Sequence, residues 1–141
     1  MKVMKKKFVF LLLAIFGLAT MINVSATSTA YWVNVTLPRL SGVETGNGQN
    51  KTIAGSQHFQ TTKAKDNLSG DTRAISVRTL GDAGASEWIS APVNSIVTWS
   101  KSQANGNTAT GHYYSQVKVT KSTLSTVNFS GTWYLDDSYL N

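Results

Sequence analysis

The 141-residue sequence contains no cysteine, only two prolines, and three methionines that all lie before residue 22. Without cysteine there are no disulfide bonds and no thiolate metal ligands. A folded domain must therefore be held together by a full hydrophobic core rather than by covalent staples. The chain after residue 26 also lacks the methionine thioether that oxidises to a sulfoxide.

Acidic residues are few, with 7 Asp and Glu against 13 Lys and Arg, which gives a net charge of +6. Four of the lysines fall within the first seven residues and precede an apolar run over residues 8–19. This is the layout of a secretory signal peptide, and Val24-Ser25-Ala26 supplies the small residues for cleavage. We expect residues 1–26 to be the signal peptide, with Ala30 as the alternative cleavage position, and residues 27–141 to form one domain.

The apolar run is shorter than the roughly 20 residues of a membrane-spanning helix, so cleavage is favoured over an uncleaved anchor. A lysine-rich leader followed by a cysteine-free domain is typical of Gram-positive bacteria. We therefore expect the protein to be secreted, either free outside the cell or associated with the cell wall.

The expected mature chain has only nine basic and seven acidic side chains. Its arginines are dispersed along the sequence, so no basic stripe for phosphate neutralisation is present. This charge distribution argues against a nucleic-acid partner.

Serine and threonine make up 31 of the 115 residues after Ala26, leucine only 7, and no apolar stripe has helical spacing. This composition favours strands and turns. Alternating patterns predict about seven strands, at residues 31–37, 57–62, 74–80, 87–90, 95–100, 113–120 and 127–134. We expect an all-β fold, a single antiparallel β-sandwich, with the last two strands forming a long hairpin and a further hairpin turn at residues 104–107.

No catalytic pattern stands out. Asp66, Asp71 and Asp82 lie in turn-forming segments, where aspartate bonds its own backbone, and Asp136-Asp137 is expected at a solvated strand end. His58 and His112 have no metal-ligand spacing. Residues 66–71 hold several oxygen ligands but lack the EF-hand pattern, so calcium there is a minor alternative. The sequence predicts a non-enzymatic protein with no catalytic, cofactor or metal site.

Aromatic residues are abundant for so polar a chain, with four Trp and five Tyr. Adjacent aromatic pairs occur at residues 31–32, 113–114 and 133–134, and a period of two sends one member of each pair to the outer face of its strand. The candidate binding residues are Trp32, Tyr114 and Tyr134.

The final strand reads Val-Asn-Phe-Ser-Gly-Thr-Trp over residues 127–133 and is followed by Leu135-Asp136. Together with the leader and the cysteine-free body, it resembles an uncharacterised family of small secreted Gram-positive proteins with a Ser-Gly-x-Trp motif. These proteins look like companions of bacteriocin export and immunity systems, and lactococcin-like bacteriocins share their style. The resemblance implies a bacteriocin-associated role and carries over no functional residue.

Three functions follow as hypotheses. The first is a secreted, non-enzymatic interaction protein that binds a cell-envelope component or a protein and is bacteriocin-like or bacteriocin-associated. The second is a carbohydrate- or cell-wall-binding module that uses exposed aromatic rings. The third is a small pore-forming β protein, although the expected hairpin arms are short for membrane insertion.

Overall fold

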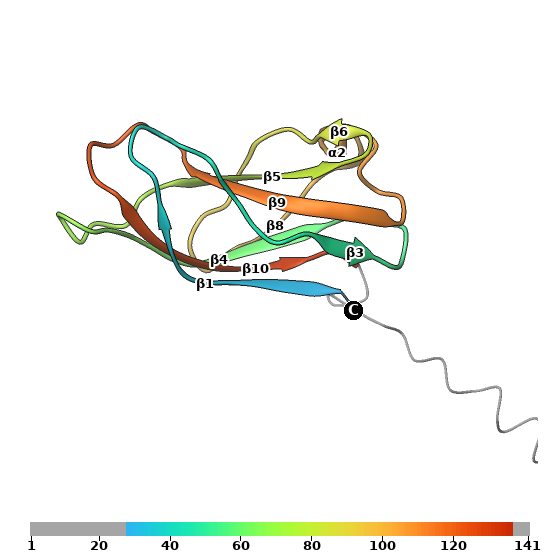
Figure 1. The fold of residues 1–141 in the computed structure, drawn as a ribbon, viewed down its shortest axis with the longest axis horizontal. Coiled ribbons are helices and arrows are strands. Elements are labelled where there is room, and N and C mark those ends of the chain that lie inside the picture. The colour runs from blue at the N-terminus through green and yellow to red at the C-terminus, as the bar shows by residue number, and fades with distance from the viewer. Residues whose placement is uncertain (1–27, 137–141) are drawn as a thin grey trace, which may run out of the picture.

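Two antiparallel sheets pack face to face in the computed structural model, which describes residues 28–136 (Figure 1). The first sheet has the order β1 (Thr29–Leu37), β10 (Val127–Tyr134), β4 (His58–Asp66) and β8 (Ile96–Thr98). The second has the order β2 (Glu44–Thr45), β9 (Gly111–Val119), β5 (Ile75–Gly81) and β6 (Gly84–Ala85), with β3 (Gln49–Lys51) paired to β9 and β7 (Ile89–Ser90) paired to β5. The all-β sandwich is confirmed, and the expected signal peptide lies outside the described residues.

Every predicted strand overlaps an observed one, and the strands that were missed are short. β2, β3 and β6 contain only two or three residues each, too few for an alternating pattern to show. No helix among residues 28–136 is long and apolar enough to cross a membrane.

The core lies between the sheets, and period-two alternation fills it. The inward rows of the two longest C-terminal strands are Tyr113, Ser115, Val117 and Val119 on β9, and Val127, Phe129, Gly131 and Trp133 on β10. Trp133 has no exposed surface, and its indole Nε1 donates a hydrogen bond to Gln57 Oε1 at 2.9 Å. Alternation therefore predicted the inward faces of these strands correctly.

The predicted hairpin between these strands is wrong. β9 pairs with β5, whereas β10 pairs with β1 and β4, so the connection at residues 120–126 crosses from one sheet to the other (Figure 1). Both strands carry a complete inward row of buried side chains. Packing these rows face to face buries both of them, and alternation alone cannot distinguish that arrangement from a hairpin.

Residues 104–107 do not form a hairpin turn either, because a short helix, α2 (Lys101–Ala104), precedes them. Ser100 Oγ accepts the backbone N–H of Gln103, and the Gln103 side chain accepts the backbone N–H of Ser100. Asn105 ends the helix in a left-handed conformation. Ser100 and Gln103 thus form a Ser-x-x-Gln capping box, a signal for the start of a helix that the prediction of a hairpin turn did not use.

A β-bulge in β1 reverses the predicted faces of its first half. Trp32 pairs with Gly131 and Val35 with Phe129, so β1 has one residue more than β10 across this interval, and Asn34 has φ +51°. The extra residue turns both Trp32 and Val35 toward the core. Tyr31, at 72% exposure, is consequently the exposed member of the first aromatic pair, and Trp32 is only 6% exposed.

Asp136 is buried, which corrects the expectation of a solvated strand end; Asp137 lies outside the described residues. The Asp136 carboxylate forms an ion pair with buried Lys51, at 3.6 Å between Nζ and Oδ1. It also accepts hydrogen bonds from the backbone N–H of Ser28 and Ile53 and from the Thr52 hydroxyl. Burial of a carboxylate is tolerated here because it is paired and fully hydrogen-bonded.

Replacement of Trp133 by alanine is expected to lower the free energy of unfolding by about 3 to 5 kcal/mol, because it opens a large cavity and removes the indole donor from the buried Gln57 Oε1. Urea denaturation measures this loss. Leu124→Ala, at a side chain that is 84% exposed, is the control and should change stability by less than about 0.5 kcal/mol. A loss below about 1 kcal/mol for Trp133→Ala would contradict its place in the core.

Candidate functional site

A cleft of about 470 Å³ opens between the edge of the first sheet and the edge of the second. Figure 1 shows β3 close to the start of β1, where the two edges approach each other. The cleft is lined by Thr29, Ala30, Tyr31, Trp32, Val35, Glu44, Thr45, Gly46, Asn47, Gln49 and Ser115. Its volume is in the range of small-molecule binding sites.

Trp32 forms the apolar floor of this cleft. Its indole Nε1 donates to Ser115 Oγ at 3.0 Å, and its ring meets Phe129 edge-on at a centroid distance of 5.8 Å. Because the polar N–H is satisfied inside the protein, the indole offers the cleft apolar surface only. The β1 bulge is therefore what brings this ring into the cleft.

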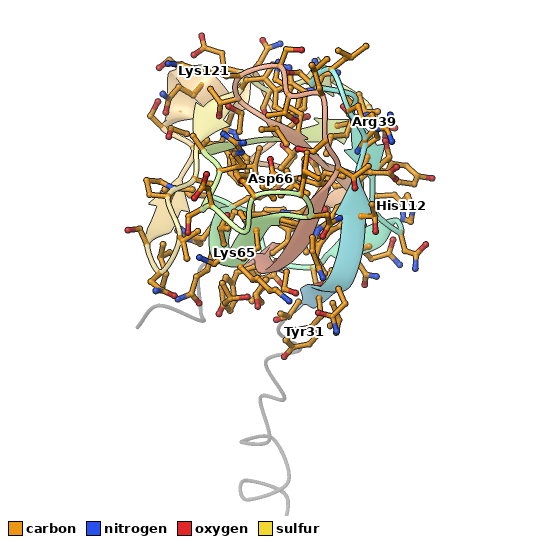
Figure 2. The ribbon with its side chains drawn as sticks, turned by 90° about the vertical axis from the view of Figure 1, so that its left-hand side faces the viewer. Tyr31, Arg39, Lys65, Asp66, His112 and Lys121 are labelled. Atoms are coloured by element: carbon orange, nitrogen blue, oxygen red, sulfur yellow. The ribbon has the colours of Figure 1, made fainter. Side chains whose placement is uncertain are left out.

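Tyr31 stands at the rim of the same cleft. Figure 2 shows it projecting outward from the start of β1, away from the body of the sandwich. An aromatic ring at 72% exposure forgoes most of the free energy that its burial would release. The rim thus presents a ring available for contact with a ligand.

The wall opposite β1 is a loop in which glycine brings the backbone close to an aromatic ring at two positions. A Cβ on Gly46 would lie 2.7 Å from Trp32 Cζ2, and a Cβ on Gly48 would lie 2.1 Å from His112 Nε2. The backbone consequently packs directly against the two rings. Asn47, between these glycines, is exposed and lines the cleft.

The polar groups of the cleft come mainly from the β2–β3 edge of the second sheet. Glu44 is the only charged residue in the lining. Glu44 pairs in register with the inward residue Val117, so it belongs to the inner face of its strand, whereas Thr45 pairs with the outward residue Gln116. The uncharged side chains with hydrogen-bonding groups that face the cleft from this edge are those of Asn47 and Gln49. With no cationic side chain in the lining, the cleft favours a neutral or cationic ligand over an anion.

The three predicted aromatic residues lie on three different surfaces. Trp32 lines the cleft, and Tyr114, at 40% exposure, lies on the outer face of β9. Tyr134 is half-buried on the outer face of β10, where its hydroxyl is 3.5 Å from Gln60 Oε1. The structure does not bring them together into one site.

Two further aromatic side chains were missed as candidates. Tyr31 was placed inward because the bulge leaves no mark in the alternating pattern. Trp88 is half-buried on the outer side of the second sheet. The signal for Trp88 was its position directly before the short strand β7, whose Ile89 pairs with the buried Val77.

Next to Tyr114, His112 extends the aromatic surface of β9. Its ring meets Tyr114 edge-on at 5.1 Å, and its Nδ1 lies 2.8 Å from Asn50 Oδ1. Figure 2 labels His112 at one side of the molecule, distant from Lys65. His58 lies elsewhere, buried on β4, with its Nδ1 2.7 Å from Thr98 Oγ1.

Asp66 shows the turn role that was predicted for it. Its Oδ1 accepts the backbone N–H of Leu68 and Ser69, and its Oδ2 accepts the Ser125 hydroxyl and pairs with Arg73 at 2.7 Å. These donors occupy both oxygens of the carboxylate. Among the described residues, no group of three or more His, Asp and Glu is placed to hold a metal ion.

The hydrogen bonds to Asp66 favour its charged form. The largest effect is the Ser125 hydroxyl, followed by the N–H groups of Ser69 and Leu68, and together they hold the pKa of this carboxyl well below its ordinary value. Burial raises the pKa of Asp136, but the bonds from Ile53, Thr52 and Ser28 and the charge of Lys51 outweigh it. The net pKa of Asp136 is also lowered.

Comparison with known proteins gives no relative for this chain: no family model, curated protein or solved structure matches it.

Stability is expected to fall on acidification. A carboxyl whose pKa is lower in the folded state stabilises the fold above its unfolded pKa of about 4, and that stability is lost as the pH falls toward the folded pKa. The free energy of unfolding, measured by urea denaturation, should therefore decrease from about pH 5 to pH 2.

The variant Asp66→Asn separates the contribution of Asp66 from that of the other carboxyls. Its stability should be lower than that of the parent at pH 7 and should change less between about pH 5 and pH 2. Asp71→Asn, at an exposed position of the same turn, is the control and should keep the pH dependence of the parent. Equal pH dependence in Asp66→Asn and the parent would contradict the role assigned to Asp66.

Proposed function

We propose that this protein is a secreted, non-enzymatic binding module that takes a neutral carbohydrate in the cleft between β1 and the β2–β3 edge. The observation that carries the proposal is the combination of an exposed ring at the rim, Tyr31, with an indole floor, Trp32, and uncharged hydrogen-bonding side chains on the facing wall. The target in this proposal is a glycan of a cell envelope.

Sugar chemistry matches this arrangement. The C–H faces of a pyranose ring are apolar and pack against aromatic rings, while its hydroxyls both donate and accept hydrogen bonds. Asn47 and Gln49 supply amide donors and acceptors, and Glu44 supplies an acceptor for two hydroxyls. An anionic sugar would meet the Glu44 carboxylate with no cation to offset it, so the cleft favours a neutral one.

The bacteriocin-associated role stays a prediction from the resemblance of the C-terminal strand, and it is compatible with a glycan target on a competitor cell. The pore-forming alternative loses its structural motivation. It rested on residues 113–133 acting as one hairpin, and these residues form strands of two different sheets.

Binding can be measured with the chain from residue 27 onward, the expected mature form. Pull-down on insoluble cell-wall preparations, amylose, chitin and β-glucan should show retention on at least one, and soluble fragments of that polymer then give a dissociation constant. Tyr31→Ala should weaken binding by roughly tenfold, because one ring contact is lost. Stability should change little, because the ring is mostly exposed.

Val33→Ala is the matched control. Val33 lies on the same strand at 69% exposure and does not line the cleft, so its variant should bind like the parent. Asn47→Ala tests the facing wall and should also weaken binding. Lack of retention on every neutral polymer, or equal losses for Tyr31→Ala and Val33→Ala, would overturn the proposal.

A further inference from the structure

A second surface lies on the outer face of the β9–β5 sheet and is built by the strand register. Arg78 pairs with Gln116, Gln116 with Thr45, and Val77 with Ile89. Trp88 directly precedes Ile89 and therefore falls beside Arg78 on the outer face. We call the group of Trp88, Arg78, Gln116 and Lys118 the Trp88 platform.

Hydrogen bonds hold the row of side chains across the sheet. Arg78 Nε donates to Gln116 Oε1 at 2.7 Å, and Gln116 Nε2 donates to Thr45 Oγ1 at 2.9 Å. The guanidinium of Arg78 is thus fixed through Nε, which leaves its two terminal nitrogens to bind an external acceptor. Fixing the cation in advance lowers the entropy lost when a ligand binds.

Two cations share the indole of Trp88. Arg78 Cζ lies 4.5 Å and Lys118 Nζ 4.4 Å from the ring centroid. Both distances are within the range of cation–π attraction, which offsets part of the repulsion between the two positive charges. Two like charges therefore lie against one indole ring on the outer face of the sheet.

Neither cation has an acidic partner within residues 28–136. Among the described residues, no carboxylate lies within 4 Å of Arg78 or Lys118, whereas Arg73 and Lys51 are each paired with an aspartate. Lys118 Nζ makes no hydrogen bond to another described side chain. Two unneutralised cations against the same ring favour an anion.

We propose that the Trp88 platform binds an acidic polysaccharide, with an anionic substituent (carboxylate, sulfate or phosphate) on Arg78 and Lys118. Arginine offers a bidentate fork to such oxyanions, and lysine a point charge. The next row of the same face holds Leu80 paired with the exposed Tyr114, and this ring provides a surface for an adjoining sugar. The chain's lack of a basic stripe disfavours a nucleic acid as occupant.

The platform differs from the cleft in both place and charge, so the two proposals stand separately. Glu44 in the cleft lies on the inner side of the second sheet, and the platform lies on its outer side. A protein that binds acidic polymers but no neutral glycan would support the platform alone, and the reverse result would support the cleft alone.

The test measures binding of the chain from residue 27 to heparin, which carries sulfates, and to polygalacturonate, which carries carboxylates. Dextran serves as the neutral polymer and single-stranded DNA as the competing polyanion. We expect binding to at least one acidic polysaccharide that weakens with added salt, and no binding to dextran. Equal or tighter binding to DNA would overturn the proposal.

The double variant Arg78→Gln/Lys118→Gln should bind the acidic polymer about tenfold more weakly, because both charged contacts are lost. Lys63→Gln/Lys65→Gln removes the same charge from β4 of the other sheet and is the matched control. If the two double variants bind the acidic polymer equally well, the net charge of the protein alone attracts the polymer, and the Trp88 platform is not its binding site. Circular dichroism verifies that each variant is folded.

Fluorescence provides a readout local to the platform. Trp88 is the only one of the four tryptophans that is not buried, so acrylamide quenching reports mainly on it. A bound acidic polysaccharide should reduce this quenching in the parent and in the Lys63/Lys65 variant. Unchanged quenching in the parent at saturating ligand would place the bound polymer elsewhere and overturn the proposal.

Discussion

The Asp136 carboxylate joins three segments that are far apart in the sequence. It accepts the N–H of Ser28, just before β1, and the Thr52 and Ile53 donors, just after β3, while its own position follows β10. Lys51 pairs with this carboxylate and donates to the Leu135 carbonyl. A buried charge without partners would be costly, so these segments must close around it. The two edges that border the cleft are fixed relative to each other by this cluster.

The cleft and the Trp88 platform use the two sides of one sheet. Period-two alternation places Glu44 on the inner side and Thr45 on the outer side, where it joins the row of Gln116 and Arg78. The inner side thus carries the Glu44 carboxylate near the aromatic rings of the cleft. The outer side carries the two cations of the platform against the Trp88 indole. A ligand with neutral sugars and acidic substituents offers chemistry to both.

Alternation predicted the strands well where a strand is long and regular. On β9 and β10 it identified the buried rows, including Tyr113 and Trp133, and it identified Tyr114 as an exposed residue. On β1 it failed for the residues before Asn34, because the bulge there inserts a residue and exchanges the faces of the first half of the strand. For the candidate site, the sequence thus identified Trp32 as a candidate residue. It predicted neither the inward orientation of Trp32 nor the exposure of Tyr31. Trp88 lies within the strand predicted at residues 87–90, but the sequence does not show that Arg78 and Lys118 lie against its ring.

The sequence by itself determined the fold class, the turn role of Asp66 and the inward faces of β9 and β10, because these depend on neighbours within a few residues. Only the tertiary structure decided that β9 and β10 belong to different sheets, that Asp136 is buried and that Trp32 lines a cleft. Each of these depends on a partner tens of residues away, such as Gly131 opposite Trp32 or Lys51 beside Asp136. Local periodicity contains no information about which distant segment supplies that partner.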